Sequence, residues 1–416
     1  MILDPDSERG VGRRRLLGWG GLAAAGVVAA GAPLVGARPG HADPASAGAG
    51  VPPDTRPGGA YDRYVAELAA QGRFSGVVLL SHRGRTVLSR SYGMADREKG
   101  IRNHEGVAVS ISSAAKPFCA VAVLQLVQQG VVKLTDTVGT YLTGFAPEIA
   151  DQVTIHHMLG DTSGLETPEQ DLQRVFHSRE EVHQYNEQWT RQARLVAAPG
   201  TGTNGHSGAN FGIPVQIVEA VTGMTYWDYV EENIFRRAGM TGSAFYTRPQ
   251  WLTDEHIAHS YMTVADGSEV DAVRNLDKGS PYPYELGKNP GRSFIDYDGF
   301  ATAPDLVRFA HALYDGTVLD RPYGEVLTAA KIPHAAQDPG GRRANSAETS
   351  FGAYLMAVGI VNGQWLFGRA GVNPGSAASW NIYPDTGWVG VVLSNSDSTP
   401  LQDILQREVQ AVTGRS

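Results

Sequence analysis

Cysteine is nearly absent from this chain of 416 residues, in which Cys119 is the single example. One thiol cannot form a disulfide within the chain, so the stability of the fold has to come from a packed core. Cys119 lies in the apolar run "PFCAVAVLQLV" (117–127). That position predicts a buried core cysteine rather than a catalytic thiol.

Runs of like charge and internal repeats are also missing. The chain has 35 Lys and Arg residues against 43 Asp and Glu residues, which gives a net charge of −8. Because the neutralisation of phosphates needs clustered Lys and Arg, this balance disfavours a nucleic-acid partner. Apolar residues make up 42% of the chain, as in a globular protein with one large or two ordinary domains.

Long apolar stretches are confined to the N-terminal region. Arg13-Arg14-Arg15 precedes Leu16 and Leu17, and no charged residue follows until after Ala37. "GHA" (40–42) fits a small-x-small cleavage site, so the pattern predicts a twin-arginine-type signal peptide over residues 1–42. An uncleaved membrane anchor is the alternative. Either one predicts a secreted or cell-envelope location, with membrane contact only through such an anchor.

The rest of the chain predicts an α+β fold. Residues 43–59 are rich in Pro, Gly and Ala and are expected to be a disordered linker. Alternating β-runs with turn residues predict hairpins over 74–96, over 258–270 and around Asp385–Gly387. Strands near both ends and helices between them predict an antiparallel sheet flanked by helices. We assign 60–130 and 258–416 to an α/β sandwich domain, and 131–257 to an inserted, mainly helical domain.

A glycine-rich stretch, "PGTGTNGHSGANF" (199–211), contains the spacing G-x-G-x-x-G at Gly200, Gly202 and Gly205. In a dinucleotide-binding unit, the helix that follows leads to a second parallel strand. Here the helix "IPVQIVEAVTG" leads instead to another helical pattern, "TYWDYVEENIFRRAGM". The sequence therefore argues against nucleotide binding. His156-His157 has no third ligand pattern nearby, so no metal or organic cofactor is expected.

The clearest chemical pattern is Ser113 and Lys116 in the segment "VSISSAAKPF" (109–118). A spacing of three residues at the start of a helix places the amine within reach of the hydroxyl. Serine becomes a nucleophile when a base takes its proton, and a lysine with a pKa below its usual value of about 10.4 can be that base. Burial and the helix dipole both favour the neutral amine. Ser112 is expected to be the N-cap of this helix. An ordinary helix start with a solvated lysine is the alternative interpretation.

An ordered set of segments resembles the serine β-lactamase and penicillin-binding-protein superfamily, in its class C-like branch of esterases, D-aminopeptidases and DD-peptidases. These segments are the hairpin 74–96, "SAAKPF", "TIHHMLGDTSGL" (154–165), "NIFRRAGMTGSAF" (233–245) and "GRAGVNPGSAASWNIYPDTGWVGVVLSN" (368–395). The resemblance covers residues 61–414. It implies a β-lactamase/transpeptidase-like fold, with Ser113 as nucleophile and Lys116 as base.

The resemblance also implies two further site elements. Where the family has Tyr-x-Asn after a Pro-Gly-Thr turn, this chain has His206 and Gly208, and His206 is either a replacement proton relay or a polar loop residue. Where the family has Lys-Thr-Gly or His-x-Gly, this chain has Arg369-Ala370-Gly371. The resemblance implies that Arg369 holds a substrate carboxylate, that Gly371 lets the ligand approach, and that the N–H near Val372 joins that of Ser113 in an oxyanion hole.

Two other features of the sequence bear on the expected site. Asp161 stands where the family usually has His, and we expect it to affect loop packing rather than chemistry. Tyr282, Tyr284 and Tyr297 either line the substrate cleft or pack their own loop.

The sequence therefore predicts an exported serine hydrolase without cofactor, acting through an acyl-enzyme on a small-molecule or peptide substrate. A carboxylic ester or a D-amino-acid amide or peptide is favoured over a β-lactam, because the Tyr-x-Asn element is altered. An acyltransferase or cyclase on the same scaffold, and a non-catalytic ligand-binding protein, are the alternatives.

Overall fold

The computed structural model describes residues 50–168, 176, 178–201, 207–264, 267–275, 299–333, 349–373 and 375–414. They belong to one compact unit, Ala45–Ser416. The predicted signal peptide, His206, Tyr282, Tyr284 and Tyr297 lie outside the described residues. Across the described ranges, no helix has both the length and the apolar character needed to cross a membrane.

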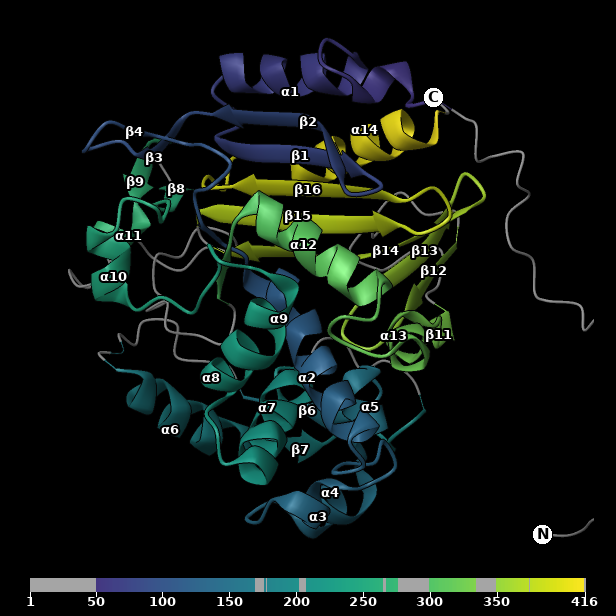
Figure 1. Ribbon diagram of the computed structural model, residues 1–416. Helices are drawn as coiled ribbons and strands as arrows, with labels where there is room; N and C mark the ends of the chain where they lie inside the picture. Colours follow the sequence, from purple (N-terminus) through teal and green to yellow (C-terminus); the bar gives the residue numbers. More distant parts are fainter. Residues whose placement is uncertain are drawn as a thin grey trace, which may run out of the picture. The chain divides into compact units, whose positions relative to one another are not determined.

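An eight-stranded antiparallel sheet forms the centre of this unit, in the order β11-β12-β13-β14-β15-β16-β1-β2. Gly76 of β1 lies opposite Ser394 of β16, so strands from the two ends of the chain are neighbours (Figure 1). This arrangement confirms the predicted fold class. The strands are β1 (Gly76–His82), β2 (Arg85–Tyr92), β11 (Ile332–Pro333), β12 (Thr349–Gly352), β13 (Ala357–Val361), β14 (Gln364–Asn373), β15 (Ser376–Tyr383) and β16 (Trp388–Ser394).

Within the described ranges, four short strand pairs accompany the large sheet. They are β3 (Met94–Asp96) with β4 (Ile101–Arg102), β5 (Val109–Ser110) with β10 (Phe300–Ala301), β6 (Leu165–Glu166) with β7 (Arg194–Leu195), and β8 (Tyr261–Thr263) with β9 (Glu269–Asp271). The predicted hairpins are confirmed as β1–β2, β8–β9 and β15–β16.

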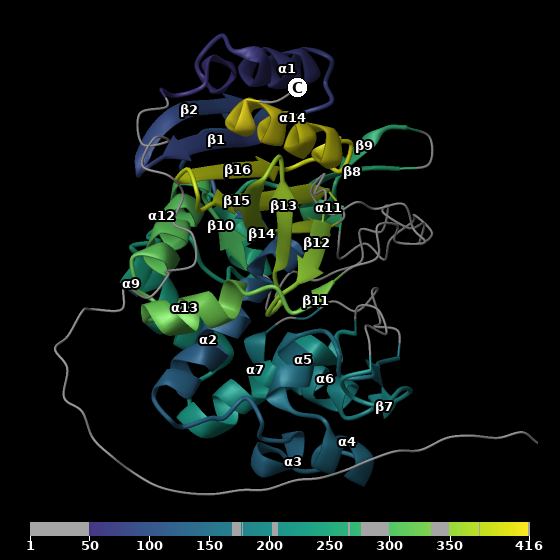
Figure 2. The same ribbon diagram turned by 90° about the vertical axis from the view of Figure 1, so that its right-hand side faces the viewer.

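Helices cover both faces of the large sheet. Figure 2 shows α1 (Ala60–Ala70) and α14 (Leu401–Thr413) on one face and α12 (Ala303–Tyr314) on the other. Successive side chains of a strand point to opposite faces. Val77 and Leu79 of β1 accordingly join the core that includes α12 and α2 (Lys116–Gln128), whereas Val78 and Leu80 pack with α1 and α14.

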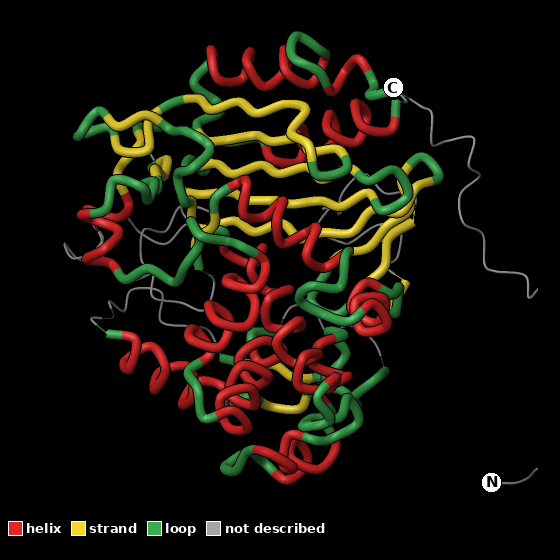
Figure 3. Tube along the Cα trace, in the orientation of Figure 1, coloured by secondary structure: helices red, strands yellow, loops and turns green. Residues whose placement is uncertain are grey.

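Most of the remaining helices lie between β5 and β10 in the sequence. Figure 3 shows strands gathered in one part of the unit and many of these helices in another. The helical segments are η2 (Pro53–Thr55), η3 (Ser112–Ala115), α3 (Val138–Tyr141), α4 (Pro147–Gln152), α5 (Ile155–Leu159), α6 (Arg179–Thr190), α7 (Ala209–Thr222), α8 (Tyr226–Val230), the π-helix η4 (Glu231–Phe235), α9 (Arg236–Ala238), α10 (Arg248–Thr253), α11 (Ala272–Asn275) and α13 (Arg321–Thr328).

The prediction of a disordered linker is wrong for residues 50–59. Pro53–Thr55 forms a 3₁₀ turn, and Thr55 is fully buried with its hydroxyl donating to the carbonyl of Pro52 at 2.7 Å. The turn packs against α1 and α14. These tertiary contacts stabilise a segment whose composition alone is typical of a flexible chain.

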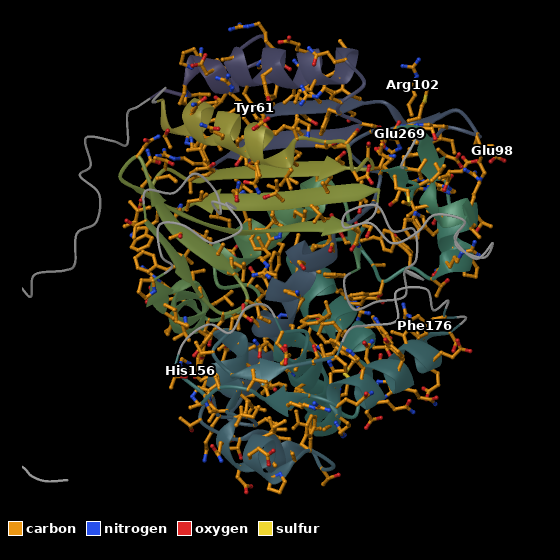
Figure 4. The ribbon with its side chains drawn as sticks, turned by 180° about the vertical axis from the view of Figure 1, so that it is seen from behind. Tyr61, Glu98, Arg102, His156, Phe176 and Glu269 are labelled. Carbon is orange, nitrogen blue, oxygen red and sulfur yellow. The ribbon has the colours of Figure 1, made fainter. Side chains whose placement is uncertain are left out.

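A buried carboxyl group lies between the sheet and the helix pair α1 and α14. Glu408 is fully buried, and its Oε1 accepts hydrogen bonds from Asn381 Nδ2 and from the Tyr383 hydroxyl, each at 2.9 Å. Gly390 faces it, and a Cβ there would lie 2.3 Å from the carboxyl carbon. Tyr61, labelled at the α1 layer in Figure 4, completes the surroundings. Burial raises the pKa of Glu408 to about 7.

We expect Glu408 to make the free energy of unfolding depend on pH. Its folded pKa of about 7 exceeds the ordinary value of 4.5, so its contribution is fully present below pH 4.5 and is lost as the pH rises to about 7. Glu408→Gln, which cannot ionise, should lose this slope and should gain stability relative to the parent chain as the pH rises. Urea unfolding over a pH series that brackets these two pKa values measures it.

The control is Asp403→Asn, which removes an exposed carboxyl from the same helix. This variant should keep the slope of the parent chain. If Glu408→Gln also kept it, the buried carboxyl would not be the source of the pH dependence.

Candidate active site

The structure brings Ser113 and Lys116 together at the start of α2. Strand β5 leads into the 3₁₀ turn η3, which carries Ser113, and the α-helix begins at Lys116. Lys116 Nζ donates to Ser113 Oγ at 3.2 Å. Lys116 is only 8% exposed, whereas Ser113 is half-buried and thus partly open to solvent. The pair has the geometry of a serine nucleophile with an adjacent amine base.

Ser112 does not cap the helix, so that prediction is wrong. Its backbone has a φ of +48°, in the left-handed region that non-glycine residues rarely occupy. Its hydroxyl donates to the carbonyl of Val372 in β14 at 3.0 Å rather than accepting from a helix N–H. The side chain therefore ties residues 111–115, which we call the nucleophile turn, to strand β14. This hydrogen bond helps to offset the backbone strain.

Gly371 on β14 lies directly against the nucleophile turn. A Cβ at this position would be 2.4 Å from Ile111 O and 2.6 Å from the backbone nitrogens of Ser113 and Ala114. The sequence suggested that a glycine here makes room for a ligand. The structure shows that the absence of a side chain at Gly371 makes room for the backbone of the nucleophile turn.

Strand β15 holds the same turn from the next position in the sheet. Trp380 is fully buried, and its indole Nε1 donates to the carbonyl of Ala114 at 2.9 Å. Trp380 pairs with Arg369 across the sheet, and Gly371 pairs with Ala378. Paired residues point to the same face, so the half-buried side chain of Arg369 lies on the face that carries the nucleophile turn.

The end of β14 presents the backbone of Val372 toward the nucleophile turn. Strand β13 pairs with β14 only as far as Gly368, and beyond it the nucleophile turn contacts this edge. The C=O of Val372 accepts from Ser112, so it points to the turn. The N–H and C=O of one residue in an extended strand leave on the same side. The N–H of Val372 therefore also points toward the turn, while its side chain is 65% exposed on the opposite face.

The first turn of α7 approaches the Ser113–Lys116 pair. The ring centroid of Phe211 lies 5.9 Å from Lys116 Nζ. Asn210 is buried, and its Oδ1 accepts from Ser163 Oγ, while its Nδ2 donates to Asp161 Oδ1 at 3.0 Å. This bridge fixes the start of α7 to the 161–164 loop.

The same loop also fixes the chain on the other side of the glycine-rich stretch. Gly200 N donates to the carbonyl of Thr162 at 2.8 Å. Residues 202–206 lie outside the described residues, so the relation of His206 to Ser113 stays a prediction. The described residues on both sides, Gly200 and Asn210, are anchored to one loop.

Sequence reasoning missed Asn210 and Trp380. The signal for Asn210 was a polar residue in the otherwise apolar start of α7, and Asp161 was noted without a partner. Their hydrogen bond accords with the expectation that Asp161 acts in loop packing. Trp380 had no local signal, because its partner Ala114 is 266 positions away in the chain.

His156, His157 and Cys119 have structural surroundings. His157 Nδ1 accepts from the backbone N–H of Thr154 at 3.2 Å in a capping box, and His156 Nδ1 lies 2.6 Å from the Tyr354 hydroxyl. Cys119 is fully buried, as predicted, and burial raises the pKa of its thiol. Among the described ranges, no group of three or more His, Cys, Asp or Glu side chains is placed to hold a metal ion.

Known proteins match this chain over most of its length. Residues 61–414 match the family described as Beta-lactamase. Penicillin-binding protein 4* of Bacillus subtilis (strain 168) is 26% identical over 265 residues, which cover 61% of this chain and 55% of that protein. Esterase EstB of Burkholderia gladioli is 40% identical over 93 residues, which cover 21% of this chain and 24% of EstB. The chain thus spans less than two thirds of the length of these two relatives.

A solved structure has the same fold. The crystal structure of D-amino acid amidase from Ochrobactrum anthropi SV3, complexed with D-phenylalanine, superposes with a TM-score of 0.66 at 20% sequence identity. The match covers 85% of this chain and 98% of the amidase.

We expect Gly371→Ala to abolish most of the reactivity of Ser113. The added methyl group would lie within 2.6 Å of three backbone atoms of the nucleophile turn, so the turn has to move away from β14. Labelling of Ser113 by a fluorophosphonate, followed by intact mass spectrometry, should be slower by about 100-fold or more.

The control is Ala370→Ser, which adds one atom to the neighbouring residue of the same strand. It should be labelled at close to the parental rate. Parental labelling of Gly371→Ala would mean that the turn does not depend on this contact.

Proposed function

The chain belongs to the beta-lactamase family, and we propose that it is an exported serine hydrolase that forms an acyl-enzyme on Ser113. The observation that carries this proposal is the hydrogen bond of 3.2 Å between Lys116 Nζ and Ser113 Oγ. Gly371 of β14 packs against the backbone of the same turn. The family contains esterases, amidases and penicillin-binding proteins, as the matches to EstB, the D-amino acid amidase and penicillin-binding protein 4* illustrate.

Acylation begins when Ser113 Oγ attacks the substrate carbonyl carbon. Lys116 Nζ, in its neutral form, accepts the proton that Oγ loses. The backbone N–H groups of Ser113 and Val372 donate to the oxygen that becomes negatively charged. The proton then passes to the leaving alcohol or amine, and the acyl group stays on Ser113.

Deacylation uses water as the second nucleophile. A base must take a proton from this water, and Lys116 or His206 performs that step in the proposal. Arg369, which lies on the face of the sheet that carries the nucleophile turn, provides a positive charge for a substrate carboxylate. No step requires a metal or an organic cofactor.

The proposed substrate is a carboxylic ester or a D-amino-acid amide or peptide. The similarity to EstB and the shared fold with the D-amino acid amidase support these two classes. Gly208 in place of the family's asparagine makes efficient β-lactam hydrolysis less favourable, since no amide side chain projects from that position. The proposed location is secreted or in the cell envelope, because of the twin-arginine-type pattern at residues 13–17.

We expect a fluorophosphonate to form one adduct with the chain and none with Ser113→Ala, as read by intact mass. Ser110→Ala should keep the adduct, because Ser110 Oγ accepts from Asn373 Nδ2 of β14, whereas the hydroxyl bonded to Lys116 Nζ is that of Ser113. An equal adduct on Ser113→Ala would reject the nucleophile, and no adduct on the parent chain would favour a ligand-binding protein. Product formed with an added amine or alcohol acceptor would identify an acyltransferase.

The role of His206 is tested separately. If its imidazole relays a proton to the leaving group, His206→Phe should lower turnover of an unactivated ester about 100-fold. Acylation by a p-nitrophenyl ester should change much less, because its leaving group departs without help from an acid. Unchanged turnover of the unactivated ester would remove His206 from the mechanism.

A further inference from the structure

Two glycines, the N-cap residue Gly208 and Gly212 in the first turn, form a notch at the start of α7. Gly208 and Gly212 are four residues apart, which places them on the same face of the helix. A Cβ at Gly208 would lie 2.1 Å from Trp189 Cη2, and a Cβ at Gly212 would lie 2.7 Å from Thr190 Cγ2. The end of α6 is therefore seated in this notch, with the indole of Trp189 where a side chain of residue 208 would start.

One hydrogen bond holds the indole in this place, and two others join the neighbouring residues of α6 to α7. Trp189 is 8% exposed, and its Nε1 donates to the carbonyl of Pro168 at 2.8 Å. The next residue, Thr190, accepts from Gln216 Nε2 of α7 at 2.6 Å. Arg191 Nη1 donates to Gln216 Oε1 at 2.7 Å. The ring is thus held by the contact between the two helices and by a bond of its own.

The notch lies next to the candidate catalytic pair. Phe211 N donates to the carbonyl of Gly208 at 3.1 Å, so the two residues belong to the same helical turn. The ring of Phe211 lies 5.9 Å from Lys116 Nζ. Trp189 therefore packs against the turn of α7 that carries Phe211, whose ring lies near Lys116.

We propose that Trp189 determines specificity, because its indole replaces the side chain of residue 208 with an apolar wall that selects substrates with an apolar acyl group. This inference rests on the proposed function. In an acyl-enzyme the acyl group stays bonded to Ser113 Oγ, so it is the part of the substrate that the neighbours of Ser113 contact throughout the reaction. An indole buries apolar acyl carbons and offers no partner to a polar amide on that group.

Two double variants separate the polarity of the wall from its packing. The leucine double variant combines Trp189→Ala with Gly208→Leu, and it fills the vacated space from α7 with an apolar side chain. The asparagine double variant combines Trp189→Ala with Gly208→Asn, and it fills the space with a polar side chain of nearly the same size. Gly208 has a φ of −63° and a ψ of −24°, which any residue adopts. Fluorophosphonate titration of Ser113 gives the fraction of intact sites in each preparation.

The measurement is the ratio of kcat/KM for p-nitrophenyl hexanoate to that for p-nitrophenyl acetate, per titrated site. The parent chain should favour the hexanoate, and the leucine double variant should keep the parental ratio within about threefold. The asparagine double variant should lower the ratio about tenfold or more. Thr190→Ser, which removes the contact with Gly212 but keeps the hydroxyl, should leave the ratio unchanged.

Equal ratios in the two double variants would overturn the proposal, because the polarity of the wall would then have no effect. A parent chain with no preference for the hexanoate would overturn it as well. A parent chain that neither reacts with the fluorophosphonate nor hydrolyses either ester would contradict the proposed function itself. If the double variants fail to fold, Trp189→Phe provides the test: loss of Nε1 with retention of the apolar ring should preserve the ratio, and a fall of about tenfold would overturn the proposal.

Discussion

The candidate active site depends on the contact between Gly371 and the backbone of the nucleophile turn. No side-chain atom fits there, because even a Cβ would overlap Ile111 O and the nitrogens of Ser113 and Ala114. This contact sets the distance between β14 and η3, which in turn allows Ser112 to reach the carbonyl of Val372. The two backbone N–H groups of the proposed oxyanion hole belong to these same two segments. Their geometry is therefore fixed by backbone packing rather than by flexible side chains.

Strand β15 links this site to the opposite face of the sheet. Trp380 holds the carbonyl of Ala114 on one face, while the next residue, Asn381, donates to Glu408 on the other. Glu408 belongs to α14 and is covered by α1, so both terminal helices of the unit support the strand that positions the nucleophile turn. A change in the ionisation of Glu408 thus acts on the layer directly behind the active site.

The sequence correctly predicted features that depend on residues close together in the chain. The Ser-x-x-Lys spacing placed Ser113 and Lys116 in contact because both lie on consecutive helical turns, and the hairpins followed from alternation and turn residues. The errors came from long-range contacts. Ser112 bonds to a strand 260 positions away instead of capping its helix, and Thr55 is buried by helices that composition does not reveal.

The sequence also could not predict which atoms contact Gly371 or where the Trp189 side chain lies. Each depends on which atoms pass close to a residue that is distant in the chain or carries no periodic signal. The resemblance to a family supplied the identity of the glycine but not the atoms it contacts. The role of His206 stays a prediction, because this residue lies outside the described residues.

The order of the strands affects when, during synthesis, the proposed site can be completed. The nucleophile and its base are synthesised early, but β14, β15 and β16 come near the end, and Ser394 reaches back to the carbonyl of Ser75 across 319 positions. Contacts of such long sequence separation form late, because the intervening chain must be ordered first. In the proposed mechanism, a chain that has not yet added β14 carries Ser113 and Lys116 without the Val372 N–H of the oxyanion hole. The proposed reactivity therefore depends on the last strands of the sheet and is a property of the completed fold.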